Sequence, residues 1–506
     1  MKARLMFGDT DFRALWEPQV GESDLIADLE LEVLWQTMAQ GDDVILESVR
    51  TAFLDRLTDP EPIRYRQAIL ADCLANPEIV REMYALAVQA VDEEKQVFRS
   101  MFSNRGDALV RRSLTVLELY SNALKRLRQL AEHSDTSFTS DGFTRFFDTL
   151  RAELDDDYFE EIAEHMRSLR FKDGVVATAR LGKLGQGVDY ILRVRPRAHR
   201  LLKFLPPSIG KPSFSYTVPP RDDGGSQELA ALRDRVLALV ANAVGQSTDH
   251  ITNFFKALRV ELAFYVGAIN LHDQLSTKGE PTCMPDPHPP GSLIRNAKGL
   301  YDACLSLRIE QRVQGNDITA DGRPLIMVTG ANQGGKSTFL RSVGLAQVMM
   351  QAGMFVAAEH YTADVASGVF THYKREEDAT MVSGKFDEEL ARMSHLTAAI
   401  TSGALLLCNE SFAATNEREG SEIAAEVIRA MTDTGSTIVF VTHLYELASS
   451  FEREHADTTV FLRAERDQEG RRSFQLTEAG PLPTSYGEDL YRQTFEPGRV
   501  AAGDRG

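Results

Sequence analysis

Apolar residues recur three and four positions apart through most of the first half of the chain. This spacing is that of the buried stripe of an amphipathic helix, and it predicts helices over residues 29–38, 45–57, 63–74, 108–133, 142–169 and 226–275. Thr58-Asp59-Pro60 separates the second of these helices from the third. Long helices that carry many charged residues are typical of a rod or a bundle, so we expect one here.

Short apolar runs replace the helical pattern near Lys172. Residues 175–179 and 190–194 predict two strands around a glycine-rich turn at 182–187. A stretch rich in proline and glycine follows at 206–225, and we interpret residues 172–222 as a small strand-containing insertion. Residues 281–291 contain five prolines, which predicts a linker.

Beyond this linker, short apolar runs alternate with helical patterns. Residues 325–329, 405–408 and 437–441 predict buried strands. The helical patterns between them indicate a mostly parallel sheet. The C-terminal part of the chain is therefore predicted to be an α/β domain.

The composition is that of an ordinary globular protein, with 506 residues, of which 43% are hydrophobic and 26% are charged. This length corresponds to about three domains. The four cysteines form no CxxC pair, which excludes a zinc ribbon or a disulfide scaffold and favours the reducing cytoplasm. The N-terminus lacks the pattern of a secretory signal, and we interpret the charge-free run 342–358 as a buried helix, so we expect a cytoplasmic protein without a membrane span. The net charge of −18 argues against an overall basic surface but permits a local basic patch.

A phosphate-binding motif follows the first of the predicted strands. Gly330-Ala331-Asn332-Gln333-Gly334-Gly335-Lys336-Ser337 has the form GxxxxGK[ST], and a helical pattern follows it. The glycines let backbone N–H groups face a phosphate chain at the N-terminus of a helix, where the helix dipole favours an anion. We expect Gly330 to Thr338 to bind ATP, with Lys336 on the β and γ phosphates and Ser337 on Mg²⁺.

Two further strands end in polar residues that favour ATP chemistry. Residues 405–408 lead into Asn409 and Glu410, as in a Walker B strand, where both side chains would lie near Mg²⁺ and Glu410 would activate water. The strand 437–441 leads to His443, a candidate for sensing the γ phosphate or positioning water. The alternative is an ordinary buried strand and a structural histidine, but the upstream phosphate loop favours the functional interpretation.

Ser383 and Gly384 open the helical pattern that contains Leu390 and Met393. A serine and a glycine at a helix start offer a hydroxyl, free backbone N–H groups and the helix dipole to an anion. The alternative is a simple helix cap, and these residues alone do not decide between the two.

These motifs, in this order and at these spacings, resemble the MutS family of DNA mismatch-repair ATPases, within the ABC-type ATPase class. Residues 329–341 resemble the family's TGxNxGGKSTxxR loop, and residues 351–358 resemble its QxGxFVPA helix end. Residues 442–447 are similar to its THxxEL, residues 485–487 to its SYG, and Asn316-Asp317 to its ND. The likeness covers residues 300–490, and it extends more weakly to residues 63–67 and 226–275.

The resemblance implies a helical core and lever over residues 1–280, including the insertion at about 172–222, then a linker at 281–294. It implies a P-loop ATPase domain of the ABC and MutS type over residues 295–495, with a flexible tail at 496–506. It further implies a homodimer with composite sites, in which Ser383, with Gly384, is the signature serine that serves the opposite subunit. ATP and Mg²⁺ would then control DNA binding in repair or recombination.

The chain also departs from the family pattern. The Phe-x-Glu mismatch-reading motif is missing and little sequence precedes the predicted core helices, so we expect a shortened MutS-like protein without the mismatch-binding domain. Asn409 stands where a Walker B strand has aspartate, which predicts slow hydrolysis or weaker Mg²⁺ binding. Val313 stands at the adenine-stacking position, and Ser383 lies one residue from the place of the family's signature serine.

Two groups of basic residues are candidates for nucleic-acid contacts: Arg111, Arg112, Lys125, Arg126 and Arg128, and then Arg193, Arg195, Arg197, Arg200 and Lys203. The alternative for both groups is a solvated face. Few aromatic residues lie among them, so we expect contacts with the backbone of branched or duplex DNA. Two other functions stay open, namely an ATP-driven switch that acts on structured RNA or ribosomes and a slow nucleotide-gated scaffold for proteins.

Overall fold

The structure is a computed structural model that describes residues 1–12, 18–100, 106–134, 137–171, 174–183, 187–193, 217–219, 221–330, 333–375, 384–466 and 472–482. Its contacts divide the chain into two compact units. The first unit contains residues 1–3, 81–138 and 143–259, and the second contains residues 4–80, 139–142 and 260–506. Helices α5 (Pro77–Ser100) and α9 (Asp223–Thr277) each contribute residues to both units.

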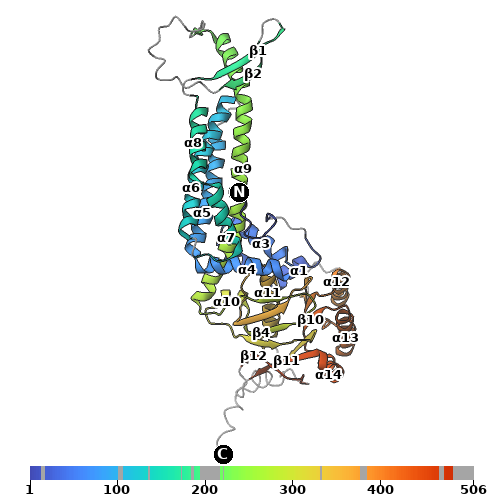
Figure 1. Cartoon of the computed structure of the whole chain (residues 1–506). Helices are drawn as coiled ribbons and strands as arrows, with labels where there is room; N and C mark the ends of the chain where they lie inside the picture. The colour runs from blue at the N-terminus through green and yellow to red at the C-terminus, as the bar shows by residue number, and fades with distance from the viewer. Residues whose placement is uncertain are drawn as a thin grey trace, which may run out of the picture. The chain divides into compact units, whose positions relative to one another are not determined.

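The first unit is built mainly from long helices (Figure 1). Besides most of α5 and α9, it contains α6 (Gly106–Ser134), most of α7 (Asp141–Glu153) and α8 (Asp156–Leu169). The hydroxyls of Tyr120 and Thr252 lie 2.8 Å apart, and the Tyr120 ring lies 5.5 Å from that of Phe255, so α6 and α9 share a core. The helix predicted over 142–169 is two helices, because Asp155 adopts an extended conformation and caps α8 by accepting a hydrogen bond from the Tyr158 N–H.

The two strands predicted in the insertion are present in the first unit. Strand β1 (Val176–Leu181) pairs antiparallel with β2 (Gly187–Arg193), and Val176 lies opposite Arg193. Most of their described side chains are exposed, as expected for a two-stranded ribbon. Residues 194–216 of the insertion lie outside the described residues.

Two sheets organise the second unit. The larger has the strand order β12-β11-β6-β10-β9-β8, and the smaller has the order β3-β7-β4-β5. The strands are β3 (Asp286–His288), β4 (Arg295–Leu300), β5 (Asn316–Thr319), β6 (Leu325–Gly330), β7 (His360–Asp364), β8 (Val369–Tyr373), β9 (Leu405–Asn409), β10 (Thr437–Val441), β11 (Thr459–Arg466) and β12 (Arg472–Glu478). Every pairing in the larger sheet is parallel except that of β12 with β11, so the predicted mostly parallel sheet is present.

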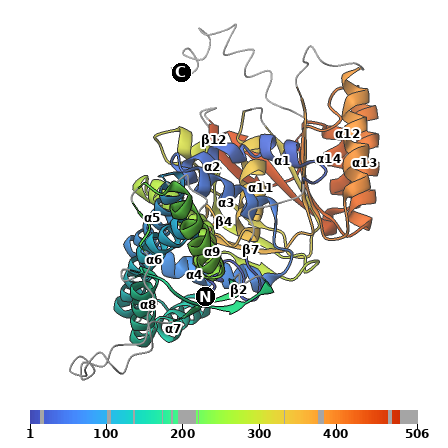
Figure 2. The ribbon, with the colours of Figure 1, turned by 90° about the horizontal axis from the view of Figure 1, so that it is seen from above.

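Helices cover both faces of the larger sheet. Alternate residues of β6, β9 and β10 form one core with α12 (Lys385–Ala399), α13 (Glu417–Asp433) and α14 (Tyr445–Glu454), which lie together in Figure 2. Helix α11 (Lys336–Gln351) contacts β8, β9 and β10 on the other side and also contacts β4 of the smaller sheet. Two short helices, α10 (Ala303–Arg308) and the 3₁₀ helix η4 (Ala456–Thr458), complete this unit's C-terminal part.

Residues 4–80 belong to the second unit, whereas the sequence predicts one helical domain over residues 1–280. They form α1 (Glu22–Asp28), α2 (Leu31–Ala39), α3 (Asp43–Leu54) and α4 (Pro60–Ala75). Leu29 is fully buried, and a Cβ at Gly344 of α11 would lie 2.5 Å from Leu29 Cδ2 and 2.7 Å from Leu407 Cδ1. This close packing joins the N-terminal helices to α11 and the larger sheet.

The segment 281–294, which the sequence predicts as a linker, contains ordered structure. Its strand β3 pairs in parallel with β7, with Asp286 opposite Thr362. The backbones of Cys283 and Val356 exchange hydrogen bonds of 3.2 Å and 2.9 Å. The prolines of this segment are therefore compatible with a short edge strand. In the described part of the chain, no helix is both long enough and apolar enough to cross a membrane.

Candidate functional site

The ends of three parallel strands meet at one edge of the larger sheet. Val441 of β10 lies opposite both Val328 of β6 and Asn409 of β9. Because the strands are parallel, the polar residues that follow them emerge at this same edge. A cavity of about 1000 Å³ opens there, lined by Gln333, Gly335, Lys336, Ser337, Thr338 and Glu410 from these strand ends.

The loop between β6 and α11 has the backbone that a phosphate cradle needs. Gly330 has φ 106°, and a Cβ there would lie 2.5 Å from the carbonyl oxygen of Ala464 in β11, so only glycine fits. Gly335 has φ 92° and immediately precedes the first residue of α11. Gly334 is buried, while Ala331 and Asn332 lie outside the described residues.

Lys336 is 5% exposed, and its Nζ donates a hydrogen bond of 2.9 Å to the carbonyl oxygen of Gly330. Burial lowers the pKa of Lys336, and the charge of Glu410 acts in the opposite direction. An ammonium group held at the start of α11, beside the positive end of the helix dipole, creates a site that favours an anion.

The Ser337 hydroxyl donates a hydrogen bond of 3.0 Å to Oδ1 of Asn409. Mg²⁺ prefers oxygen ligands such as these, so the two residues fit a magnesium site that phosphate oxygens would complete. In the described ranges, no three His, Cys, Asp or Glu side chains gather to hold a metal ion. A divalent ion at this place would therefore be held by the neutral oxygens of Ser337 and Asn409, by the Glu410 carboxylate and by phosphate oxygens.

Glu410 follows β9 with a left-handed backbone, φ 54°, and its N–H donates to the carbonyl oxygen of Val441. Such a conformation costs about 1–3 kcal/mol for a residue other than glycine and is concentrated at functional sites. Glu410 lines the cavity, and its Oε2 lies 3.9 Å from Nδ1 of His443. The structure thus brings together the two residues that the sequence proposes as catalytic, although His443 stands behind Glu410 and does not line the cavity.

A buried histidine contacts Ser411, the residue that follows Glu410. His372 in β8 is fully buried, with Nδ1 2.7 Å from Oγ of Ser411 and Nε2 3.2 Å from the carbonyl oxygen of Glu389. Since a carbonyl oxygen can only accept, Nε2 carries the proton. The one hydroxyl hydrogen of Ser411 is shared between Nδ1 and the carbonyl oxygen of His372, which lies 2.8 Å from Oγ. Burial lowers the pKa of His372 to about 4, so this histidine is neutral. Sequence reasoning missed it because Ser411 and Glu389 lie far from it along the chain.

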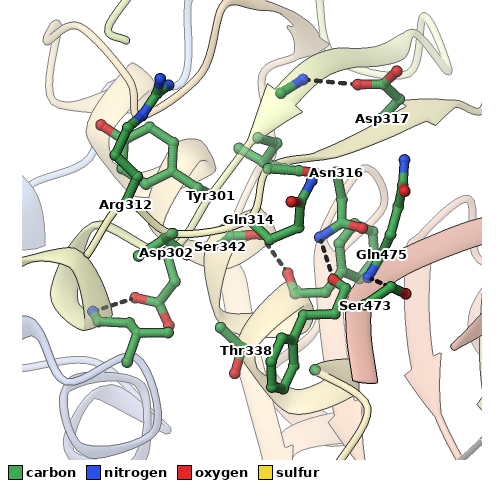
Figure 3. A pocket seen from close by; sticks show the side chains of 18 of the residues that line it. Tyr301, Asp302, Arg312, Gln314, Asn316, Asp317, Thr338, Ser342, Ser473 and Gln475 are labelled. Atoms are coloured by element: carbon green, nitrogen blue, oxygen red, sulfur yellow. Dashed lines mark hydrogen bonds between the residues drawn. The ribbon is translucent and has the colours of Figure 1, made fainter. Parts of the chain in front are cut away.

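Aromatic residues lie at two places on the cavity wall that the sequence did not identify. In Figure 3, Tyr301 and Arg312 lie on one side of the cavity, and Ser473 and Gln475 lie on the other, with Thr338 between them. Tyr301 is 2% exposed, whereas Phe474 is 47% exposed and has φ 56°. A Cβ at Gly335 would lie 3.6 Å from Cβ of Phe474, so this ring belongs to the mouth of the phosphate loop.

The Asn316 side chain joins the cavity wall to the last strand. Its Nδ2 donates to the carbonyl oxygen of Phe474 over 3.4 Å, and its Oδ1 accepts from the Leu476 N–H over 2.7 Å. The asparagine of the Asn316-Asp317 motif therefore ties β5 to β12. Val313 also lines the cavity, and its N–H donates to Glu280.

The remaining predicted site residues lie elsewhere. Gly384 is the residue before α12, with φ −61°, and it is not among the residues that line the cavity, while Ser383 lies outside the described residues. Arg193 is exposed at the end of β2 and donates a hydrogen bond of 3.1 Å to Thr178. The other residues of its group, Arg195, Arg197, Arg200 and Lys203, lie outside the described residues.

In the group on α6, Arg126 pairs with Glu82 and Arg128 pairs with Glu132 and Asp156. Lys125 lies over the ring of Phe159, with Nζ 5.2 Å from the ring centroid. These contacts favour a solvated, ion-paired face for this group.

Comparisons with known proteins relate both halves of the chain to the same proteins. The family model described as MutS2 N-terminal domain matches residues 58–278, and the one described as MutS domain V matches residues 326–504. DNA mismatch repair protein MutS 2 of Halobacterium salinarum is 31% identical over 192 residues, which are 38% of this chain and 22% of that protein. DNA mismatch repair protein MutS of Geobacillus kaustophilus is 32% identical over 168 residues, which are 33% of this chain and 18% of that protein.

A human relative, MutS protein homolog 4, is 27% identical over 150 residues, which are 30% of this chain and 16% of that protein. The chain thus spans between 16% and 22% of the length of these relatives.

Proposed function

The chain belongs to the MutS family, and on that premise we propose that it binds and hydrolyses ATP and uses the nucleotide to control its binding to DNA. One observation carries the proposal: a single cavity brings together Lys336, Ser337 and Glu410, the residues that ATP chemistry requires at the ends of β6 and β9. The names of the relatives, which include DNA mismatch repair proteins, support DNA as the partner.

The phosphate chain of ATP would lie along residues 330–338. Lys336 would exchange its hydrogen bond to Gly330 for the β and γ phosphates, which satisfy a partly desolvated ammonium better than a neutral carbonyl. Ser337 and Asn409 would contribute oxygen ligands to Mg²⁺, which neutralises charge as it develops on the phosphates. Asn409 lacks the charge of the usual aspartate, so we propose slow hydrolysis.

Glu410 would accept a proton from the attacking water. Its carboxylate is on the cavity wall, and its left-handed backbone directs the side chain away from the strand. Nδ1 of His443 lies 3.9 Å from Oε2 of Glu410. From there His443 would keep the carboxylate in position and interact with its negative charge. Glu410 is thus the proposed base, and His443 is proposed to orient it.

A second subunit would complete the site. Gly384 stands at the N-terminus of α12, where the backbone N–H groups and the dipole favour an anion. It does not line the cavity of its own subunit, which supports the proposal that Ser383 and Gly384 face the γ phosphate of a partner. ATP would then hold two copies together.

The helical first unit is the proposed DNA-binding part. Helices α5 and α9 each run from one unit into the other, so the nucleotide state of the second unit has covalent routes to the first through both helices. Arg193 is exposed at the end of the β1–β2 ribbon. Contacts of such cations with phosphates would give binding that weakens strongly with salt and depends little on base sequence.

Turnover of ATP by the purified chain tests the enzymatic part. We expect slow hydrolysis by the wild type, and a loss of about a hundredfold in both Lys336→Ala and Glu410→Gln. Glu410→Gln should keep ATP binding, since the phosphate contacts are unchanged. Equal hydrolysis by Glu410→Gln and the wild type would show that Glu410 is not the base.

Labelled nucleic acids test the partner. Branched DNA, homoduplex DNA and structured RNA should be compared at two salt concentrations, with and without ATP. We expect salt-sensitive binding to DNA that ATP changes in the wild type but not in Lys336→Ala. Stronger binding to structured RNA than to any DNA would favour a switch that acts on RNA.

A further inference from the structure

An acidic segment near the N-terminus contacts four arginines, which come from four separate parts of the second unit. This acidic segment, residues 24–30, contains Asp24 and Asp28 of α1 and Glu30 before α2. Asp24 and Asp28 are four residues apart and therefore lie on one face of α1. Glu30 has φ 55°, a left-handed conformation that turns the chain between the two helices.

Asp24 and Asp28 both contact Arg375, which follows β8, and Asp24 also contacts Arg392 in α12. Nη2 of Arg375 lies 2.8 Å from Oδ1 of Asp24, and its Nη1 lies 3.2 Å from Oδ1 of Asp28. Nε of Arg392 in α12 lies 3.5 Å from Oδ2 of Asp24. Arg392 also donates two hydrogen bonds, of 3.2 Å and 3.1 Å, to the carbonyl oxygen of Tyr373. Together these contacts fix the end of β8 against the first half of α12.

Glu30 makes a second set of contacts on the nucleotide side. Its Oε1 lies 2.5 Å from Nη1 of Arg341 in α11, and its Oε2 lies 2.6 Å from Nη1 of Arg308 in α10. Nε of Arg341 lies 2.5 Å from Oδ2 of Asp302, a fully buried residue that lines the nucleotide cavity. Glu30 therefore joins the helix that begins with Lys336 to the opposite wall of that cavity.

Apolar packing holds the acidic segment in place between these contacts. Leu29 is fully buried against Gly344 and Leu407, and Sγ of Cys304 lies 3.5 Å from the carbonyl oxygen of Glu30. Gly21, before α1, lies where a Cβ would be 2.9 Å from Leu396 of α12. A segment packed on both sides cannot shift one set of its ion pairs without straining the other.

We propose that the acidic segment is a positioning element of the ATPase, which holds Gly384 and helix α12 at a fixed place relative to helix α11 of the same subunit. This inference rests on the proposed function, since it assigns the two sets of contacts to different sites of a dimer. Asp24 and Asp28 position the residues that face the partner's phosphate loop. Glu30 serves the site of its own subunit.

Removing the two charges should therefore slow hydrolysis without weakening ATP binding. In Asp24→Asn/Asp28→Asn we expect kcat to fall about tenfold, because displacing a transition-state contact by even 1 Å can cost about a hundredfold. The affinity for ATP should change by less than about twofold, since the cavity is untouched. Glu32→Gln is the control for the loss of a nearby carboxylate: Glu32 pairs with Arg50 in α3, so this variant loses one charge of an ion pair that involves neither α11 nor α12.

Mixed dimers separate the two roles. Lys336→Ala subunits lack a working phosphate loop but keep the wild-type Asp24, Asp28 and Gly384. Mixed with them, Asp24→Asn/Asp28→Asn subunits should regain hydrolysis above the mean of the two pure proteins. Glu30→Gln subunits should not, because their own cavity is affected. Absence of rescue in the first mixture, or equal rescue in both, would overturn the inference.

Amide hydrogen exchange tests the inference without ATP turnover. In Asp24→Asn/Asp28→Asn, peptides covering residues 374–392 should exchange at least about fivefold faster than in the wild type, while peptides covering 405–441 should not change. Unchanged exchange at 374–392 would contradict the positioning role. If the wild type hydrolyses no ATP, the proposed function fails, and hydrogen exchange still decides whether the acidic segment holds the ends of this stretch.

Discussion

The Ser337 hydroxyl donates a hydrogen bond of 3.0 Å to Oδ1 of Asn409. Ser337 is the second residue of α11, and Asn409 is the last residue of β9, so this bond joins the phosphate loop to the strand that precedes Glu410. An aspartate at position 409 would accept the same hydrogen bond with a full negative charge. The bond therefore keeps the geometry of the site, while the site has one negative charge fewer beside Mg²⁺ than it would have with aspartate.

Asn409→Asp should strengthen Mg²⁺ binding in the presence of ATP. One added carboxylate beside a divalent ion contributes about 1–4 kcal/mol at contact distance, so we expect the Mg²⁺ concentration for half-maximal hydrolysis to fall about tenfold. Magnesium titrations of hydrolysis by the wild type and the variant measure this. Ser337→Ala, which removes the partner hydroxyl, should shift the titration in the opposite direction. A variant that needs as much Mg²⁺ as the wild type would show that position 409 does not hold the ion.

Phe474 is predicted to contact the base of ATP. Its ring is exposed at the mouth of the phosphate loop, whereas Tyr301 is buried in the opposite wall. Phe474→Ala should weaken ATP binding about fivefold, in line with about 1 kcal/mol for the loss of a stacking contact. Binding of tripolyphosphate, which has no base, should not change, and Phe474→Tyr should bind ATP normally. Equal losses for ATP and tripolyphosphate would instead place Phe474 on the phosphates.

The pKa of His372 predicts how stability depends on pH. It is about 4 in the folded protein against 6.5 for a free histidine. Between these values the unfolded chain binds more protons than the folded one, so stability is fully present above pH 6.5 and is lost as the pH falls towards 4. The loss amounts to about 3 kcal/mol.

Urea unfolding at several pH values measures this loss. The free energy of unfolding of His372→Gln should fall less steeply between pH 6.5 and 4 than that of the wild type. His395→Gln, which changes an exposed histidine of α12, is the control and should keep the wild-type slope. Identical slopes in all three proteins would show that His372 does not stay neutral in the fold.

Gly344→Ala tests whether the N-terminal helices pack on the larger sheet. Its Cβ would meet Leu29 at 2.5 Å and Leu407 at 2.7 Å, so we expect a loss of about 1–3 kcal/mol in the free energy of unfolding. Gly245→Ala in α9 is the matched control, because no atom lies within 4 Å of its new Cβ. That control should be neutral or slightly stabilising. Equal stability of both variants would contradict the packing of Leu29 against α11.

The elements near the site could be predicted because their signals are local. The strands at 325–329, 405–408 and 437–441 are mostly apolar and lead into the residues of the motifs, and a parallel sheet places such ends at one edge. Helix α9 was predicted over 226–275 and runs from Asp223 to Thr277, because few breakers interrupt its pattern. Short apolar runs also predict the two strands of the β1–β2 ribbon.

The parts that could not be predicted depend on contacts between distant residues. Nothing in the pattern around Leu29 indicates that it packs against Gly344, so the N-terminal helices were expected in a different domain. The break at Asp155 was missed because the apolar spacing continues across it. Phe474 lines the cavity and His372 contacts Ser411 beside Glu410, each from a strand whose sequence carries no motif. The acidic segment is recognisable only from the arginines that it contacts.

The most direct test of the account is an equilibrium titration of magnesium–ATP into the wild type and Lys336→Ala at matched concentrations. The account predicts saturable binding to the wild type below millimolar ATP, and a loss of about a hundredfold in Lys336→Ala. No binding to the wild type at millimolar ATP, or equal binding to the two proteins, would contradict it.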